Sequence, residues 1–173
     1  MRRILSLLAV GVVWLAAGLF SSGCIGYKLG NNLPPGVHSV AVPVFMNETG
    51  EPGLETLTTS AAIQEFQKDG SLKVSDRATA DTVVEVTLKK YTLTPLRYRS
   101  ERTTTAKEYR LTLVADVVWK KLPGQEVLAR NSKVEGYKDF EALADLPSAR
   151  RDALPDAAAD LAHRIVRTVV EYW

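Results

Sequence analysis

The sequence predicts an α+β fold in which a four-stranded, mostly antiparallel sheet carries two helices on one face. Two observations lead to this prediction. Residues 106–121 alternate apolar and polar side chains, which is typical of a strand with one buried face. Residues 154–169 repeat apolar side chains every three or four positions, which is typical of an amphipathic helix. Such a strand and such a helix bury their apolar sides by sharing one core.

The first strand and the first helix are predicted from the residues before position 71. Residues 37–45 are β-branched and apolar, and the valines at positions 40, 42 and 44 fall on one face of the expected strand. A loop rich in Asn, Gly and Pro follows. Apolar spacing then predicts a helix over residues 54–69, and Gly70 ends it because glycine readily adopts the left-handed conformation.

Two more strands flank residues 106–121, and a helix closes the chain. Residues 81–91 alternate before the long strand, and residues 126–137 follow it after a Pro-Gly turn, so the last two strands form a hairpin. We expect the last helix to begin near Pro155, because proline fits best in a first helical turn. The alternative is a helix that begins near Ser148 and is kinked at the proline.

The N-terminus has the pattern of a secretory signal. Two arginines follow Met1, residues 4–20 carry no charge, and small residues lead up to Cys24. This arrangement resembles the lipobox of bacterial lipoproteins, in which the cysteine is acylated and becomes the first residue of the mature chain. Ser21 departs from the leucine that the lipobox favours. The alternative is a signal anchor in which Cys24 is incidental.

Three segments follow from the lipoprotein interpretation. Residues 1–23 are a signal peptide, residues 24–36 a lipidated linker and residues 37–173 the α+β domain. Cleavage before Cys24 leaves 150 of the 173 residues and removes two arginines, so 20 basic side chains balance 20 acidic ones. This balance argues against a nucleic-acid partner. The covalent lipid on Cys24 is the only cofactor expected, since one Cys and two His offer no ligand spacing typical of zinc.

Catalytic motifs are missing from the sequence. It holds no nucleophile-elbow serine, no zinc-protease helix motif and no phosphate-binding glycine loop. Glu48, Glu51 and Glu55 cluster near the first helix, where we interpret them as a solvated loop with favourable charge at a helix N-terminus. We therefore expect a protein that is not an enzyme.

Basic residues gather between positions 89 and 110, where seven basic and two acidic side chains give a charge of +5. The centre holds Arg97, Arg99 and Arg102 among Ser and Thr residues, in a linker between two predicted strands. Guanidinium groups bind phosphate bidentately, and hydroxyl groups add donors. In a bacterial envelope such phosphate is carried by lipids and lipopolysaccharide. The alternative is a solvated hairpin end whose charges keep the sheet edges soluble.

The order and spacing of several short motifs resemble the LptE family of lipopolysaccharide-assembly lipoproteins, from about residue 24 to residue 170. A Gly-Tyr pair follows the cysteine closely, and a Leu-Pro pair precedes the first strand. The other motifs lie at the start of the first helix, at its end and at the start of the long strand. They are Asn47-Glu48-Thr49, Pro52-Gly53-Leu54-Glu55, Phe66 to Gly70 and Thr105 to Tyr109.

The resemblance implies an outer-membrane lipoprotein on the periplasmic side. Members of the family plug the lumen of the LptD β-barrel, bind lipopolysaccharide and help deliver it to the outer leaflet, without a chemical step. By position Arg102 corresponds best to the family's lipopolysaccharide contact, with Arg97 and Arg99 beside it. A second basic position before the last helix falls on Arg150 and Arg151.

Two other functions remain open at this stage. The chain could be a different envelope adaptor lipoprotein, such as a pilotin for a secretin, or a lipid-anchored hydrolase. A large β-barrel partner distinguishes the assembly plug from the adaptor, and the missing nucleophile and base argue against the hydrolase.

We predict that Cys24→Ser releases the protein from membranes or leaves it unprocessed. Each buried CH₂ of an acyl chain contributes about 0.8 kcal/mol, so that two or three chains anchor a protein firmly. Intact mass spectrometry of the mature protein checks this prediction, and an unmodified thiol at Cys24 contradicts it.

Overall fold

The computed structural model describes residues 33–98, 106–142 and 145–171. All of them belong to one compact unit, which begins at Asn31. The predicted signal peptide, Cys24 and most of the linker therefore lie outside the described residues, as do Arg99 and Arg102.

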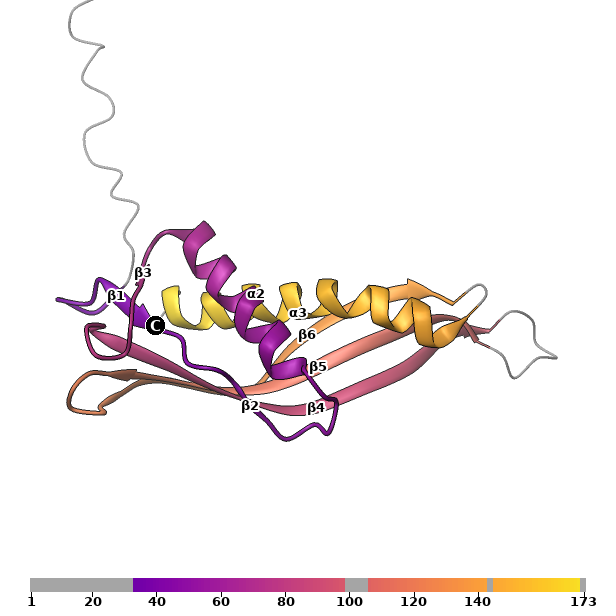
Figure 1. Cartoon of the computed structure of the whole chain (residues 1–173), viewed down its shortest axis with the longest axis horizontal. Coiled ribbons are helices and arrows are strands. Elements are labelled where there is room, and N and C mark those ends of the chain that lie inside the picture. The colour runs from indigo at the N-terminus through magenta and orange to yellow at the C-terminus, as the bar shows by residue number, and fades with distance from the viewer. Residues whose placement is uncertain (1–32, 99–105, 143–144, 172–173) are drawn as a thin grey trace, which may run out of the picture. The chain divides into compact units, whose positions relative to one another are not determined.

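The described residues form an α+β fold with a six-stranded sheet and two helices (Figure 1). Neither of these helices combines the length and the apolar character that crossing a membrane requires. In chain order the elements are β1 (Ser39–Ala41), β2 (Met46–Asn47), α2 (Leu54–Asp69), β3 (Lys73–Val74), β4 (Thr82–Tyr98), β5 (Ala106–Lys121), β6 (Val127–Glu141) and α3 (Leu146–Val170).

The sheet is mixed. Its strands lie in the order β3-β1-β4-β5-β6, and β2 also pairs with β4. The short strands β1, β2 and β3 make only parallel pairs, whereas β4, β5 and β6 pair antiparallel with their neighbours in the chain. The α+β class is confirmed, but the prediction of four mostly antiparallel strands is wrong. The two strands that were missed, β2 and β3, have two residues each, too few to show a period of two.

The predicted first strand is interrupted because the chain leaves the sheet after Ala41. Pro43 has no N–H to donate to a ladder, and Phe45 donates its N–H to Oγ1 of Thr59 on α2 at 3.0 Å. Phe45 is buried, whereas Val44 is 71% exposed. The prediction that the three alternate valines share one face is therefore wrong. The chain then rejoins the sheet as β2, beside β4.

The strand predicted over residues 106–121 is confirmed as β5, and β4 is longer than predicted. The sequence pattern ends at Tyr91, but β4 continues to Tyr98. A register shift between Leu88 and Lys90 marks a bulge there. The bulge interrupts the alternation but brings Tyr91 opposite the buried Leu113. The apolar–polar alternation therefore stops near the bulge, although the strand itself continues to Tyr98.

The hairpin of the last two strands is confirmed, with small corrections to its second strand. β6 pairs antiparallel with β5 and runs four residues past the predicted end at Tyr137. A further register shift between Ala115 and Val117 lies opposite Lys133, which has a positive φ of 79°. β6 therefore bends within its length.

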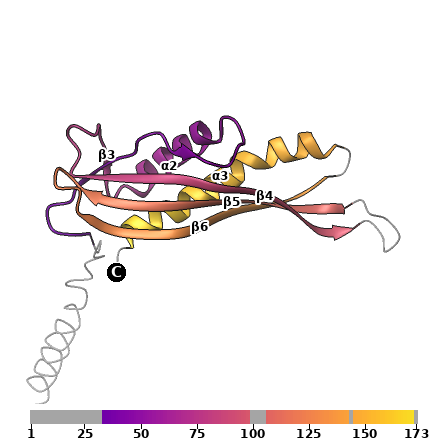
Figure 2. The same cartoon turned by 90° about the horizontal axis from the view of Figure 1, so that it is seen from below.

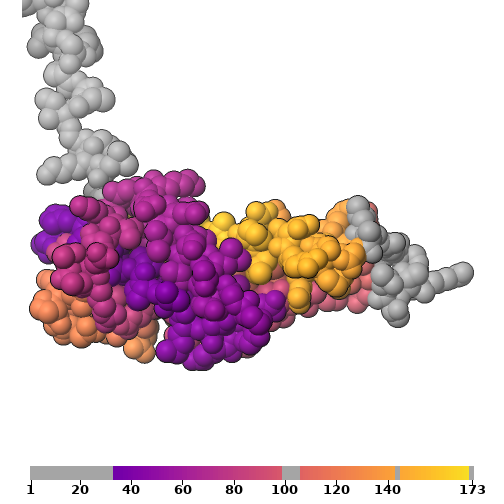
Figure 3. Space-filling view, viewed as in Figure 1, coloured from indigo at the N-terminus to yellow at the C-terminus, as the bar shows by residue number. Residues whose placement is uncertain are grey.

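Both helices lie on the same face of the sheet (Figures 1 and 2). The predicted helix over residues 54–69 is confirmed as α2, and Gly70 ends it with a φ of 74°. In the space-filling view α2 and the loop before it pack beside α3 (Figure 3). The largest fully buried side chains come from the long strands and from both helices, and include Leu111, Leu113, Trp119, Leu54, Phe66, Leu161 and Ile165.

The backbone of α3 lies almost directly on β6. A Cβ atom added to Gly136 would stand 2.4 Å from the N and Cα atoms of Leu161. The helix face that is buried is rich in alanine, which leaves room for this approach. Beside the contact, the carboxylate of Asp160 accepts the N–H of Tyr137 at 2.9 Å. α3 therefore packs on β6 and also accepts a hydrogen bond from a backbone N–H at the outer edge of that strand.

The last helix begins earlier than expected. α3 starts at Leu146, so the expected start near Pro155 is wrong and the earlier alternative is closer. Asp145 caps the helix by accepting the N–H of Ser148 at 2.9 Å. Pro147 occupies the first turn, where its missing N–H costs no hydrogen bond. Pro155 lies inside the helix instead.

We predict that Gly136→Ala destabilises the protein by about 1–3 kcal/mol, the range for overpacked cores, because the new methyl group displaces α3. Gly124→Ala is the matched control, because a Cβ at Gly124 would meet no atom within 4 Å. Its effect should stay within about 0.5 kcal/mol. Urea unfolding measures both, and equal losses contradict the close approach.

The cap of α3 gives a pH-dependent prediction. The hydrogen bonds from Ser148 hold the pKa of Asp145 below its ordinary value of 3.8. The charged cap is therefore fully present above the ordinary pKa and is lost as the pH falls through the lower, folded pKa. The amide signal of Ser148 in NMR spectra should titrate with a midpoint below 3.8. Asp145→Asn should keep the helix start and abolish this titration, and a midpoint at or above 3.8 in the unsubstituted protein contradicts the cap.

Candidate functional site

The β4–β5 hairpin carries the described part of the predicted basic linker. Arg97 and Tyr98 form the last residue pairs between β4 and β5. Arg97 lies opposite Glu108, and Tyr98 lies opposite Ala106. The Arg97 side chain is 74% exposed, and its Nε atom is 3.6 Å from a carboxylate oxygen of Glu108. A loose, exposed ion pair of this kind contributes little to stability. The guanidinium is therefore available to a ligand.

Two exposed apolar residues stand on either side of Arg97 in the sequence, and sequence reasoning missed them. Leu96 is 42% exposed and Tyr98 is 53% exposed. The ladder between β2 and β4 ends at Leu88, so the outer edge of β4 beyond that residue pairs with none of the described strands. The hairpin end therefore exposes both a positive charge and apolar side chains.

Arg150 lies in the first turns of α3 and faces the sheet. Its Nη2 atom is 3.7 Å from a carboxylate oxygen of Glu51, and its guanidinium carbon is 5.8 Å above the ring of Tyr91. These contacts hold Arg150 between the loop before α2 and β4. Arg151 is exposed and donates to Oγ of Ser148 at 3.0 Å. Of the two arginines, Arg151 is the one without a carboxylate contact in the described structure.

The structure places the two predicted basic positions at the same end of the sheet but does not join them. α3 begins near the hairpin end in both views (Figures 1 and 2). Arg150 lies beside Tyr91, and Arg97 is six residues further along β4, which corresponds to roughly 20 Å. Arg97 and Arg150 therefore do not converge on a single phosphate.

Much of the basic excess between positions 89 and 110 is neutralised by acidic residues from elsewhere in the sequence. Lys89 is 2.6 Å from Glu48, and Lys107 is 3.5 Å from Glu141. The Nε and Nη2 atoms of Arg110 each donate to Asp139 at 2.7 Å. Hydrogen bonds from this arginine hold the pKa of Asp139 below its ordinary value. The count of charges along the sequence therefore overstates the free positive charge.

The acidic cluster near α2 has a structural role. The side-chain amide of Asn47 donates to the backbone oxygen of Glu51 at 2.8 Å and to Oε2 of Glu55 at 2.7 Å. Hydrogen bonds from the helix N-terminus, then from Asn47, hold the pKa of Glu55 below its ordinary value. A carboxylate held in its charged form by fixed donors is a poor general acid. Glu48 is the partner of Lys89 and stands apart from this network.

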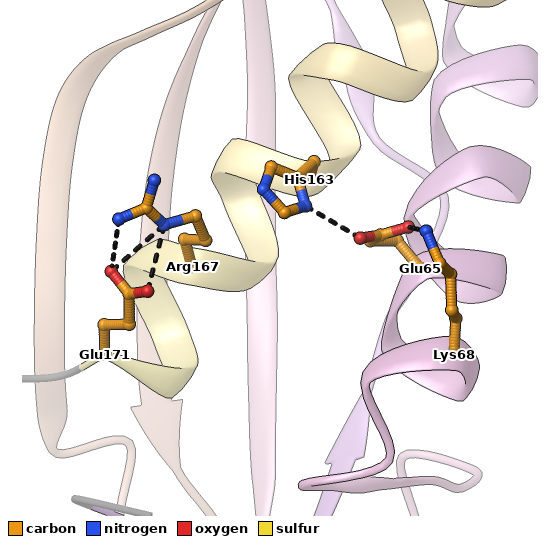
Figure 4. Close-up of polar contacts among 5 residues, drawn as sticks. All are labelled: Glu65, Lys68, His163, Arg167 and Glu171. Atoms are coloured by element: carbon orange, nitrogen blue, oxygen red, sulfur yellow. Dashed lines mark hydrogen bonds and ion pairs between the residues drawn. The ribbon is translucent and has the colours of Figure 1, made fainter.

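The histidine on α3 links the two helices. His163 on α3 contacts Oε1 of Glu65 on α2 at 2.8 Å through its Nδ1 atom, as Figure 4 shows. Its side chain is 56% exposed, so this histidine is largely solvated. Within residues 33–98, 106–142 and 145–171, no three His, Cys, Asp or Glu side chains gather as metal ligands would.

Solved structures resemble this chain at low sequence identity. A protein from Xanthomonas campestris has a TM-score of 0.56 and 10% identity, over 80% of this chain and 90% of that one. A minor lipoprotein from Acinetobacter baumannii has a TM-score of 0.50 and 12% identity, over 77% and 92%. Rare lipoprotein B from Shewanella oneidensis has 18% identity at a TM-score of 0.45, over 77% and 95%.

The comparison with family models identifies a family, whereas the solved structures show only a shared fold. No curated protein is a match for this chain. The family model LptE, described as lipopolysaccharide-assembly, matches residues 37–169. The match covers most of the sequence and nearly all of the described fold. The chain therefore belongs to the LptE family of lipopolysaccharide-assembly proteins.

Proposed function

We propose that this protein is an outer-membrane lipoprotein that plugs an LptD-type β-barrel and helps insert lipopolysaccharide into the outer leaflet. Membership of the LptE family over residues 37–169 carries the proposal. The protein acts by binding and positioning, without a chemical step. The hydrogen-bonded carboxylates and the solvated histidine described above support this part.

The lipid anchor belongs to the same proposal. Residues 1–23 direct export, and Cys24 becomes the acylated first residue of the mature chain. Ile25 follows it, where an aspartate commonly retains lipoproteins in the inner membrane, so we expect sorting to the outer membrane. Two or three acyl chains hold the folded unit firmly at the periplasmic surface.

The hairpin end is the proposed lipopolysaccharide contact. Arg97 supplies a guanidinium for phosphate, and the exposed Leu96 and Tyr98 supply apolar contacts at the same hairpin end. Lipopolysaccharide carries phosphate and acyl chains close together, so this arrangement suits its chemistry. We assign Arg99 and Arg102 to the same contact from their sequence positions.

The second basic position contributes through Arg151 in this proposal. Arg150 already contacts Glu51 and Tyr91, and its role is to fix the start of α3. Because Arg97 and Arg150 lie roughly 20 Å apart along β4, the two positions contact different groups of a large ligand.

We predict that replacing Arg97, Arg99 and Arg102 by Glu abolishes binding to lipopolysaccharide at 0.15 M salt, because phosphate is then repelled. Binding of the unsubstituted protein should weaken as salt rises, since exposed charges are screened over about 8–10 Å. Surface charges usually change stability by less than about 0.5 kcal/mol, so the fold and the barrel complex should persist.

Arg77→Glu is the matched control for this triple variant. Arg77 is also exposed and also makes one loose ion pair, with Glu85 at 3.3 Å, but it lies away from the hairpin end. Lipopolysaccharide binding measured by co-sedimentation should be lost in the triple variant only. A folded triple variant that binds like the unsubstituted protein contradicts the proposed contact. Loss of the barrel complex instead would make the hairpin a protein-contact surface.

A further inference from the structure

The first nine residues of α3 are packed more loosely than the rest of that helix. Of residues 146–154 only Ala153 is buried. The remainder of the helix has seven buried residues, which are Ala157, Ala158, Leu161, Ala162, Ile165, Val166 and Val169. A segment with few buried apolar contacts opens at a lower free energy than the rest of its element. We call residues 146–154 the α3 flap.

Pro155 separates the flap from the well-packed part of α3. A proline inside a helix has no N–H for the carbonyl four residues earlier, here that of Arg151, so one helical hydrogen bond is missing at the junction. Prolines are a common cause of kinks in helices for this reason. Beyond the junction, the close approach of Leu161 to Gly136 holds the helix on β6. The flap therefore joins the fixed part of α3 through a weak point.

The contacts that hold the flap closed are weak. Arg150 reaches Glu51, with 3.7 Å between its Nη2 atom and a carboxylate oxygen, and partly exposed ion pairs at such distances contribute little to stability. Its guanidinium carbon is 5.8 Å from the ring centre of Tyr91. The hydroxyl of Tyr91 is buried and has no hydrogen-bond partner in the described part of the chain. Because such a hydroxyl is unfavourable, opening that admits water to it is assisted.

An apolar surface lies on the face of the β4–β5–β6 sheet that the helices cover. Leu93 is paired with the buried Leu111, and Tyr109 is paired with Phe140. Residues two apart on a strand share a face, so all four lie on the side of the core. The rings of Tyr109 and Phe140 are stacked with their centroids 6.0 Å apart. Leu93, Tyr109 and Phe140 are only partly buried. We call these four side chains the hairpin floor.

The flap begins near the hairpin end, on the same side of the sheet as the floor (Figures 1 and 2). Asp156, directly after the hinge, is 2.7 Å from Lys138, which is paired with Leu111 of the floor. Arg150 lies over Tyr91, two residues before the floor on β4. Residues 150–156 therefore lie next to strand residues that adjoin the floor, and they cover it without burying it fully.

We propose that the α3 flap swings on Pro155 and admits an acyl chain of lipopolysaccharide between itself and the hairpin floor. The inference rests on the proposed function for the identity of the lipid, and it adds the place where the hydrocarbon binds. Burial of hydrocarbon against aromatic and aliphatic side chains is favourable in proportion to the area removed from water. Arg97 lies four residues from Leu93, roughly 13 Å along β4, so one lipid can reach both the hairpin end and the floor.

Two other occupants fit less well. An extended peptide needs backbone partners, but the central strand of the floor, β5, is already paired with β4 on one side and with β6 on the other. A partner helix is about 10 Å wide and would require the flap to leave the sheet altogether. A hydrocarbon chain is narrow and needs no hydrogen-bond partner.

The first test places the photoreactive residue p-benzoylphenylalanine at position 109 of the full-length protein, where one aromatic ring replaces another. Irradiation of envelopes should cross-link this position to lipopolysaccharide, identified by mass spectrometry. Position 94 is the matched control, because Thr94 is exposed and lies next to Leu93 on the opposite face of β4. Its cross-linking to lipopolysaccharide should be at least about fivefold weaker, since neighbouring residues of a strand face opposite sides.

The second test stiffens the hinge. Pro155→Ala restores the N–H donor, so hydrogen exchange of the amides of residues 150–154 should slow about tenfold. Cross-linking at position 109 should fall at least about fivefold for the same reason. Pro147→Ala is the matched control, because Pro147 lies in the first turn, and it should change both by less than about twofold. In the unsubstituted protein the amides of residues 150–154 should exchange at least about tenfold faster than those of residues 161–166.

Four results would each overturn the proposal. They are no photoproduct at position 109, a photoproduct there with phospholipid or protein alone, unchanged cross-linking in Pro155→Ala, and equal exchange in the two parts of α3. Co-sedimentation with lipopolysaccharide separates these results from a failure of the proposed function. A protein that binds lipopolysaccharide and retains its β-barrel, but gives no lipid product at position 109, contradicts only the flap. One that binds neither contradicts both.

Discussion

The contact between Gly136 and Leu161 determines how the rest of the molecule is arranged. With no side chain at position 136, the backbone of α3 reaches β6 at a distance that any Cβ would forbid. The alanine-rich face of α3 then covers β5 and β6, and Leu161 and Ile165 reach the core around Trp119. α2 packs against α3, so the position of the whole helical layer depends on this approach.

The same contact sets which surfaces stay open. It brings Asp160 to the N–H of Tyr137 and so closes the edge of β6 at that point. Towards its N-terminus α3 carries Arg150 to the ring of Tyr91 on β4. The β4–β5 hairpin continues beyond the helices, as Figure 2 shows. The proposed lipopolysaccharide contact therefore lies where the helical layer ends, on strands that the buried face already stabilises.

Sequence periodicity predicted the helix and the strand whose apolar pattern is unbroken. It missed the short strands, which are recognised only by their hydrogen bonds to neighbouring strands. Residues 54–69 and 106–121 were predicted with the bounds that the structure has, because each keeps one period throughout. The short parallel strands β2 and β3 have too few residues to show a period. The predicted end of β4 fell close to its bulge, seven residues before the strand ends. The expected start of α3 was too late because Pro147, and not Pro155, occupies its first turn.

The candidate site was predicted in part, for a related reason. The basic residues at the hairpin were found in the sequence, but their pairing was not, since Glu48, Glu141 and Asp139 come from distant segments. Local sequence gives the sign of a charge, whereas only the fold shows which charges are neutralised. The exposure of Leu96 and Tyr98 could not be predicted either, because alternating apolar residues in a strand normally mark its buried face.

The most direct test of the central claim is the identity and stoichiometry of the partner that the lipidated protein retains. The full-length protein, tagged at its C-terminus, would be isolated from envelopes in mild detergent, and the mass of the intact complex measured. Our account predicts one copy of this chain with one LptD-type β-barrel. Isolation with a secretin, or without any barrel partner, would contradict the assignment to lipopolysaccharide assembly and favour a pilotin-like adaptor.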